Sequence, residues 1–598
     1  MIGGNEYNAK SLSASEVAKW FVLPETHFLP LLSKDHTVIF GPRGSGKTTL
    51  FKMLTIKALA NWKTPDSDSM LSKVRFNAAL VPADNLWGKQ LSVIEEKFPG
   101  QNIGERIFVA HTIRSLLLEM MDVITVSKSK STAKISHLTA NISPDKEKIF
   151  SEVLAEAYGV QPKLNSVLGL VLAIESLLAN VSNFSENENA FKIENLSGLI
   201  NLTVSTFNGL DGNTDRQWAL LFDELEIAPP SVLKTVVSLM RGSRHGITYK
   251  LALAPYTPEI IEANSPDDPK ADHDYQVIPL TYPNKSDAKI FADQLTEKIF
   301  GLIPSKDNKM LSIFGKPYNR ITHEEKGILP VEFENLRVKD TSFAAYLKNH
   351  DFESKEFTDE SERAQFLRKI APIVKARDYY IAKYKNGHVV RNRSRKTYAL
   401  YCGYPSILEI ADGNPRTLLT MLTPLARAYS YNKLVGRTTK INKSMQTDAI
   451  KRAEFLQISL LNVLPIDIPA FRKERGLVEF VDIIGRAFER KLLHDPFRAD
   501  WCGEFNVDQN VSDATVRAIG QAINVGSFVY APHPDANPSG ILSGIRGKKF
   551  RLSYSLAARY RLLLTLGQPI NLSTLLEKDE DFNSLLKQAS LFSSQNEN

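Results

Sequence analysis

Residues 37–48 read Thr37-Val38-Ile39-Phe40-Gly41-Pro42-Arg43-Gly44-Ser45-Gly46-Lys47-Thr48, and this stretch sets the architecture of the chain. Its first four residues are apolar or β-branched and predict a buried strand, whereas the apolar periodicity of residues 47–59 predicts a helix. Between them, the spacing G-x-x-x-x-G-K-T lets backbone N–H groups curl around a phosphate, and the helix N-terminus adds partial positive charge. We therefore expect a strand, a phosphate-binding loop and a helix in succession, with a chance match as the alternative.

The loop predicts ATP and Mg²⁺ as ligands. The ammonium group of Lys47 would bridge the β- and γ-phosphates, and the hydroxyl group of Thr48 would ligate the metal. The residues expected to contact the nucleotide are Gly41, Pro42, Arg43, Gly44, Ser45, Gly46, Lys47, Thr48 and Thr49.

A second strand of buried character, residues 218–222, ends in the acidic pair Asp223 and Glu224. Open α/β sheets bind ligands at the carboxyl ends of their strands. We expect Asp223 to hold Mg²⁺ through water and Glu224 to act as the general base that polarises the attacking water. The alternative is a solvated acidic strand end without a catalytic role.

The rest of the N-terminal half predicts an α/β fold. Residues 74–81, 249–254 and 275–280 have the character of further strands, and helical segments separate them. Strands that alternate with helices favour a parallel sheet covered on both faces.

From residue 283 onward the chain is mainly helical. Over residues 477–554 the predicted order is helix, helix, strand, loop and strand, which suits a winged helix. The predicted domains are an N-terminal segment (1–35), a P-loop core (36–282), a helical lid with a basic insertion (283–464), a winged-helix-like domain (470–570) and a C-terminal tail (571–598).

The turn Gly413-Asn414-Pro415-Arg416 is expected to start a helix in the lid, with Arg416 on its first turn. There the guanidinium group could reach the γ-phosphate across a cleft. On the residues alone, an ordinary helix start accounts for this turn equally well.

In this order, the loop of residues 41–48, the strand ending in Asp223-Glu224 and the turn ending in Arg416 resemble the motifs of AAA+ ATPases. Within that superfamily the chain is similar to the initiator clade that includes the origin-recognition ATPases. It resembles more closely their bacterial relatives, some of which are found in anti-phage defence and mobile-element loci. The resemblance covers roughly residues 14–464 and implies an ATPase with an α/β P-loop (AAA+) core, a helical lid and a C-terminal winged-helix-like domain.

The resemblance also implies roles for single residues. Arg416 would be the second sensor arginine, and Phe21 and Val22 would form part of the adenine pocket. A polar sensor would fall near Tyr256 or Thr257.

One departure from the family pattern concerns the arginine finger that activates hydrolysis across a subunit interface. Its usual place corresponds to residues 255–276, which contain no arginine and only Lys270. Arg241 and Arg244 have the right chemistry at an unusual position, although cations at a helix C-terminus also offset the helix dipole without any catalytic role.

Positive charge is concentrated at residues 375–396, where eight cations face one acidic residue, Asp378. Tyrosines interleave with these cations, a mixture that combines phosphate neutralisation with stacking and so favours double-stranded DNA or another nucleic acid. A solvated helix face, or a clamp against an acidic partner subunit, explains the pattern equally well. The cations are Lys375, Arg377, Lys383, Lys385, Arg391, Arg393, Arg395 and Lys396.

The composition and the cysteine spacing exclude some classes of protein. The 598 residues carry 74 Lys plus Arg against 67 Asp plus Glu, and Cys402 and Cys502 lack the spacing of a disulfide framework or thiolate metal site. No signal peptide or membrane-length apolar run is recognisable, so we expect a cytoplasmic protein without a membrane partner.

The favoured function is ATP binding and hydrolysis that switches the conformation or assembly of the chain while it engages DNA or an effector, with phage defence as a candidate setting. The expected partners are a homo-oligomer, an effector protein or both. The alternative is a slow-turnover, nucleotide-gated signalling scaffold that binds no nucleic acid. A metabolic P-loop kinase is a third possibility, but it would leave the lid and the winged helix without a purpose.

Overall fold

The computed structural model describes residues 8–64, 67–82, 93–94, 96–98, 100–127, 133–179, 184, 190–241, 246–258, 269–281, 285–302, 309–317, 330–350, 360–392, 398–468, 471, 476–532 and 544–577. The chain divides into two compact units. The core unit comprises Tyr7–Gly41 and Gly46–Thr281, and the C-terminal unit comprises Met1–Glu6, Pro42–Ser45 and Tyr282–Asn598. Each unit is described by itself.

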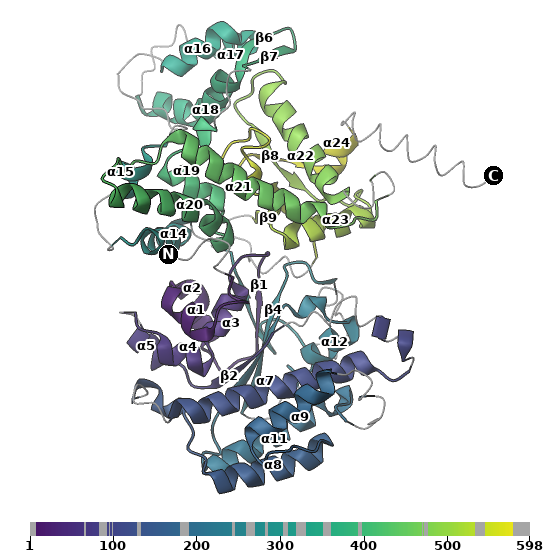
Figure 1. The fold of residues 1–598 in the computed structure, drawn as a ribbon. Coiled ribbons are helices and arrows are strands. Elements are labelled where there is room, and N and C mark those ends of the chain that lie inside the picture. The colour runs from purple at the N-terminus through teal and green to yellow at the C-terminus, as the bar shows by residue number, and fades with distance from the viewer. Residues whose placement is uncertain are drawn as a thin grey trace, which may run out of the picture. The chain divides into compact units, whose positions relative to one another are not determined.

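A five-stranded parallel sheet forms the centre of the core unit, with strand order β2-β3-β4-β1-β5 (Figure 1). Its central strands are buried on both faces, as expected for apolar runs in a parallel sheet. Only β4 lies between β1 and β3, so the ends of these two strands open onto the same edge of the sheet. The strands are β1 (Thr37–Phe40), β2 (Asn77–Val81), β3 (Trp218–Asp223), β4 (Ile247–Leu253) and β5 (Gln276–Pro279).

Helices cover the sheet, with α1–α5 on one side and α12 on another (Figure 1). A capping box between Ser13 and Glu16 begins α1, as the sequence predicts. The helices of this unit are α1 (Ala14–Trp20), α2 (Glu25–Leu31), α3 (Lys47–Met53), α4 (Ile56–Asn61), α5 (Ser67–Leu71), α7 (Ile103–Ser127), α8 (Pro144–Tyr158), α9 (Val167–Ala179), α11 (Leu196–Asp211) and α12 (Pro230–Ser238).

The helix predicted for residues 47–59 is interrupted. It ends after α3, Thr55 is extended, and α4 begins at Ile56. The buried carboxylate of Glu119 accepts a hydrogen bond from the backbone N–H of Ile56 at 2.7 Å. This side chain from α7 satisfies a donor that the new helix start leaves free, so a distant residue stabilises the break.

The C-terminal unit is mainly helical. The helices are α14 (Lys285–Phe300), α15 (Lys309–Phe314), α16 (Val331–Lys339), α17 (Thr341–Asn349), α18 (Glu360–Tyr380), α19 (Tyr404–Ala411), α20 (Pro415–Leu434), α21 (Lys443–Asn462), α22 (Gly476–Leu493), α23 (Asp513–Asn524) and α24 (Leu572–Glu577). No helix among the described residues of either unit is long and apolar enough to cross a membrane.

Two further sheets belong to this unit. The predicted basic stretch contains a hairpin that the sequence analysis does not foresee, and β8 and β11 complete a four-stranded sheet of order β11-β8-β10-β9. The strands are β6 (Ile381–Lys385), β7 (His388–Arg391), β8 (Cys502–Asn506), β9 (Phe528–Tyr530), β10 (Lys549–Leu552) and β11 (Gln568–Asn571).

The region predicted as a winged helix contains α22, α23, β9 and β10 at the expected positions, together with the unforeseen β8 and β11. The winged-helix assignment itself stays a prediction. The predicted tail of residues 571–598 begins with an ordered helix, α24, whose Leu572, Leu575 and Leu576 are buried.

Candidate nucleotide-binding site

The loop after β1 adopts a backbone that its glycines make possible. Gly44 has φ +89° and Gly46 has φ +98°, and Gly46 is the N-cap of α3. Left-handed conformations cost an L-residue about 1–2 kcal/mol, so a side chain at either position would destabilise this conformation of the loop. The two glycines of the motif thus stand at the positions where the loop backbone has a positive φ angle.

Lys47 lies on the first turn of α3 with its side chain directed back to the loop. The residue is 8% exposed, and its Nζ donates a hydrogen bond to the carbonyl oxygen of Gly41 at 2.5 Å. A buried ammonium group held over the loop is well placed to meet an anionic ligand bound there.

Asp223 and Thr48 meet at the edge of the sheet, although 175 residues separate them. The hydroxyl group of Thr48 donates to Oδ2 of Asp223 at 2.7 Å. Asp223 is 2% exposed, and its Oδ1 is buried without a hydrogen-bond partner among the described residues. Burial raises the pKa of Asp223, and the Thr48 hydrogen bond and the charge of Lys47 offset part of this rise.

These groups fit Mg²⁺. The metal prefers oxygen ligands and is usually held by one or two carboxylates together with substrate phosphates. An orphaned carboxylate oxygen beside a threonine hydroxyl supplies that chemistry.

Glu224 follows β3 in a left-handed backbone conformation with φ +52°. Such a conformation is costly for a non-glycine residue and is often found at functional sites. The Glu224 carboxylate forms an ion pair with the ammonium group of Lys10, and the two side chains are 30% and 50% exposed. Lys10 comes from the N-terminal segment, which the sequence analysis treats as separate from the core.

Lys52 of α3 fixes this segment on the core unit. Its Nζ donates to the carbonyl oxygen of Ala9 at 2.8 Å and to that of Leu12. Burial lowers the pKa of Lys52. The segment that carries Lys10 is therefore attached to the helix that carries Lys47.

Glu226 is an acidic residue that the sequence analysis overlooks. Burial raises the pKa of Glu226 to about 7, although the charge of Lys47 lowers it in part. The Oε2 atom of Glu226 has no hydrogen-bond partner within the described ranges. A second carboxylate two positions after Glu224 is the sequence signal that could have found it. The site thus contains three carboxylates rather than two.

The residues assigned through resemblance to the adenine pocket and the polar sensor are also described. Phe21 is buried and packs its ring against Phe28 and Trp62, with centroid distances of 5.4 Å in both cases, while Val22 is partly exposed. The hydroxyl group of Thr257 is buried and donates to the carbonyl oxygen of Ala254 at 3.0 Å. Their roles toward a nucleotide stay predictions.

Arg416 is exposed on the first turn of α20, where the sequence places it. The Asn414 side chain caps this helix by accepting hydrogen bonds from the backbone N–H groups of Arg416 and Thr417 at 3.0 and 3.2 Å. Among the finger substitutes, Arg241 is exposed beyond the end of α12, and Arg244 lies outside the described residues.

The basic stretch divides into internal and exposed cations. Arg377 is buried, pairs with Asp340 and donates to the carbonyl oxygens of Leu492 and Asp495 at 2.8 and 2.9 Å. Lys375 pairs with Glu332 and is largely buried. Both cations are engaged inside the unit, which disfavours contact of Arg377 and Lys375 with nucleic acid, and that contact stays a prediction.

The exposed cations of the stretch lie on the β6–β7 hairpin. Lys383, Lys385 and Arg391 are exposed there, and Arg391 contacts Glu489 and His494. Arg393, Arg395 and Lys396 lie outside the described residues.

Comparison with known families gives one match over nearly the whole chain. Residues 5–572 match the family model described as ORC-CDC6-like. A comparison with curated proteins finds no match.

Proposed function

The chain belongs to the ORC-CDC6-like family, and from this premise we propose that it binds ATP with Mg²⁺ at residues 41–48 and hydrolyses it to switch its assembly or its engagement of a partner. The contact between Thr48 and Asp223, with one oxygen of Asp223 left unpartnered, is the observation that carries the proposal. It joins the first turn of α3, directly after the loop, to the last residue of β3, so that phosphate and metal could bind at one edge of the sheet.

Each residue of the site then has a chemical task. The backbone N–H groups of the loop and the ammonium group of Lys47 bind the phosphates, and Thr48 and Asp223 would hold Mg²⁺, which would neutralise phosphate charge. Glu224 accepts a proton from the attacking water. Arg416 binds the γ-phosphate from the lid and reports whether it is present.

The Lys10–Glu224 ion pair supports slow basal turnover, because a carboxylate that is paired with an ammonium group is less available to water. An exposed pair contributes up to about 1 kcal/mol, which corresponds to about fivefold in rate. We expect Lys10→Ala to raise steady-state ATP turnover by up to about fivefold.

Lys19→Ala is the matched control for this change, since Lys19 is an exposed lysine of the neighbouring helix α1. Its turnover should equal that of the wild type. A decrease in turnover in Lys10→Ala would contradict the restraining role and would make Lys10 an activating cation instead.

The absence of an arginine from residues 255–276 favours the second candidate function, a nucleotide-gated scaffold with slow turnover. The two candidates differ in their response to partners. Hydrolysis coupled to DNA requires that duplex DNA changes the turnover rate, whereas a scaffold turns over ATP at the same rate with and without DNA.

DNA engagement is proposed for the exposed hairpin cations Lys383 and Lys385. Reversal of two phosphate-contacting charges strongly weakens an electrostatic complex. We expect Lys383→Glu combined with Lys385→Glu to weaken retention of duplex DNA at low salt by at least about tenfold, measured by fluorescence anisotropy.

The control for this variant reverses two exposed lysines elsewhere in the same unit, Lys433→Glu combined with Lys440→Glu. This control changes the net charge by the same amount. An equal decrease of DNA affinity in both double variants, or no binding of DNA by the wild type, would reject the DNA part of the proposal.

A further inference from the structure

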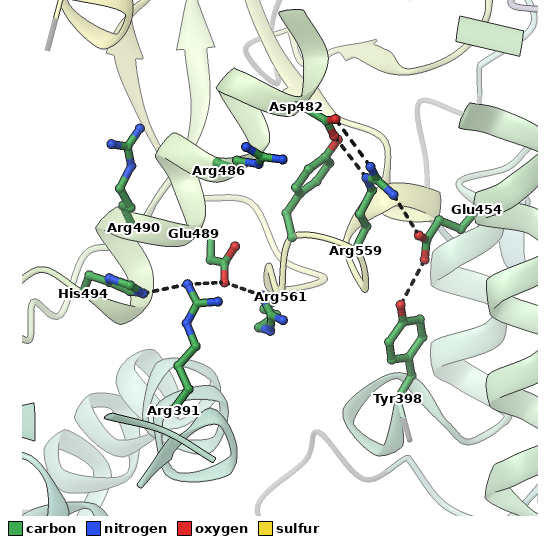
Figure 2. A pocket seen from close by; sticks show the side chains of 11 residues that line it. Arg391, Tyr398, Glu454, Asp482, Arg486, Glu489, Arg490, His494, Arg559 and Arg561 are labelled. Carbon is green, nitrogen blue, oxygen red and sulfur yellow. Dashed lines mark hydrogen bonds and ion pairs between the residues drawn. The ribbon is translucent and has the colours of Figure 1, made fainter. Parts of the chain in front are cut away.

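A polar cavity of about 510 Å³ lies inside the C-terminal unit, formed by parts of the chain that are far apart in sequence (Figure 2). Helix α22 contributes four of the eleven lining residues, and three of these, residues 482, 486 and 490, follow one another at a spacing of four and share a face. The rest of the lining is formed by Arg391 at the end of β7, Tyr398, Glu454 on α21, His494 and residues 559–561.

The lining of the cavity is polar throughout. Every residue that lines the cavity is an arginine, a carboxylate, a histidine or a tyrosine, so the cavity suits a polar ligand rather than an apolar one. Five arginines face three carboxylates, which leaves two positive charges in excess. The arginines are Arg391, Arg486, Arg490, Arg559 and Arg561.

The carboxylates hold three of these arginines in place. Glu489 is buried and accepts from both Arg391 and Arg561, with N–O distances of 3.3 and 2.5 Å. Asp482 accepts from Nε and Nη2 of Arg559 at 3.1 and 3.4 Å. Fixed guanidinium groups that stay one-third or more exposed are pre-organised donors for a ligand.

Arg486 differs from these three. It is exposed, and no hydrogen bond or ion pair holds it within the described residues (Figure 2). Its guanidinium group therefore retains its full capacity to bind an anion, and its replacement breaks no hydrogen bond or ion pair among the described residues.

Two positions in the chain around the cavity are unusual. Arg561 has φ +56°, a conformation that non-glycine residues rarely adopt. The ring of Tyr560 packs directly on α22 at Gly485, where an added Cβ would lie 2.6 Å from the ring. The same tyrosine donates its hydroxyl hydrogen to Asp482 at 2.5 Å.

We propose that this cavity binds a phosphorylated small molecule of nucleotide size, at a site separate from residues 41–48. The arginines match the phosphate oxygens, the carboxylates can accept hydrogen bonds from sugar hydroxyls or base N–H groups, and the partly exposed ring of Tyr398 offers a surface for a base. The volume lies in the range of small-ligand pockets. Three carboxylates in the lining disfavour the continuous phosphate backbone of a nucleic acid, which they would repel.

The test measures ligand binding by calorimetry to the full chain with Lys47→Ala, so that the loop of residues 41–48 does not dominate the signal. The probes are ADP, adenosine, inorganic pyrophosphate and a single-stranded DNA oligonucleotide. In this background Arg486→Glu is compared with Arg452→Glu, a matched change of an exposed arginine on α21 that does not line the cavity.

We expect ADP to bind more tightly than adenosine, and Arg486→Glu to weaken ADP binding by at least about tenfold, while Arg452→Glu changes it by less than twofold. Equal affinity of ADP in the two variants, or no binding of ADP and pyrophosphate, would overturn the proposal. Binding of the oligonucleotide without binding of ADP would overturn it in favour of a nucleic-acid site. Arg391→Gln, which leaves Glu489 paired with Arg561, should also weaken ADP and so provides a second variant.

Discussion

If Glu224 is the general base, we expect Glu224→Gln to lower the rate of ATP turnover by about 10²–10⁴-fold. The variant should still bind ATP. The amide has the shape of the carboxylate but cannot accept the proton of the attacking water. Lys47, proposed to bind the phosphates, and Thr48 and Asp223, proposed to hold the metal, are unchanged, so ground-state binding persists. Phosphate release under saturating ATP gives the rate, and filter retention of labelled ATP gives the binding.

Glu226→Gln is the informative comparison for this variant. Glu226 is the third carboxylate of the site, after Asp223 and Glu224, and burial raises its pKa to about 7. We expect a smaller loss of turnover than in Glu224→Gln. If Glu226→Gln abolished hydrolysis and Glu224→Gln did not, the base would have to be reassigned to Glu226.

Lys47→Ala should weaken ATP binding by about a hundredfold or more. The substitution removes a buried ammonium group that we propose to contact phosphate oxygens, and each hydrogen bond to a charged group contributes about 1.5–3 kcal/mol. Lys57→Ala is the control, because Lys57 is an exposed lysine of α4 that pairs with Asp122. Titration of a fluorescent ATP analogue measures both affinities.

Thermal unfolding without nucleotide shows whether the Lys47→Ala chain is folded. Binding within twofold of wild type in a folded Lys47→Ala chain would contradict nucleotide binding by the loop.

The sequence predicts those parts of the site that depend on local signals. The strand–loop–helix order of residues 37–53 follows from apolar character and glycine spacing, and Asn414 and Pro415 suffice to start α20 with Arg416 on its first turn. Residues 218–223 form a strand because a continuous apolar run is suited to the middle of a parallel sheet.

Features that depend on distant partners are not predictable in this way. Glu119 of α7 supports the break between α3 and α4, and Asp340 binds Arg377 in the interior. A run of cations does not reveal which of its members face inward, so Arg377 and Lys383 look alike in the sequence. The arginine-lined cavity is assembled from residues between 391 and 561, and no local pattern marks it.

The most direct measurement is calorimetric titration of ATP into the full chain, with Mg²⁺ and with the metal chelated, for the wild type and for Asp223→Asn. The geometry of Thr48 and Asp223 predicts that Mg²⁺ tightens ATP binding in the wild type and that Asp223→Asn removes most of this gain. Equal ATP affinity with and without Mg²⁺ in the wild type, or an undiminished Mg²⁺ effect in Asp223→Asn, would contradict a metal–nucleotide site at this edge of the sheet.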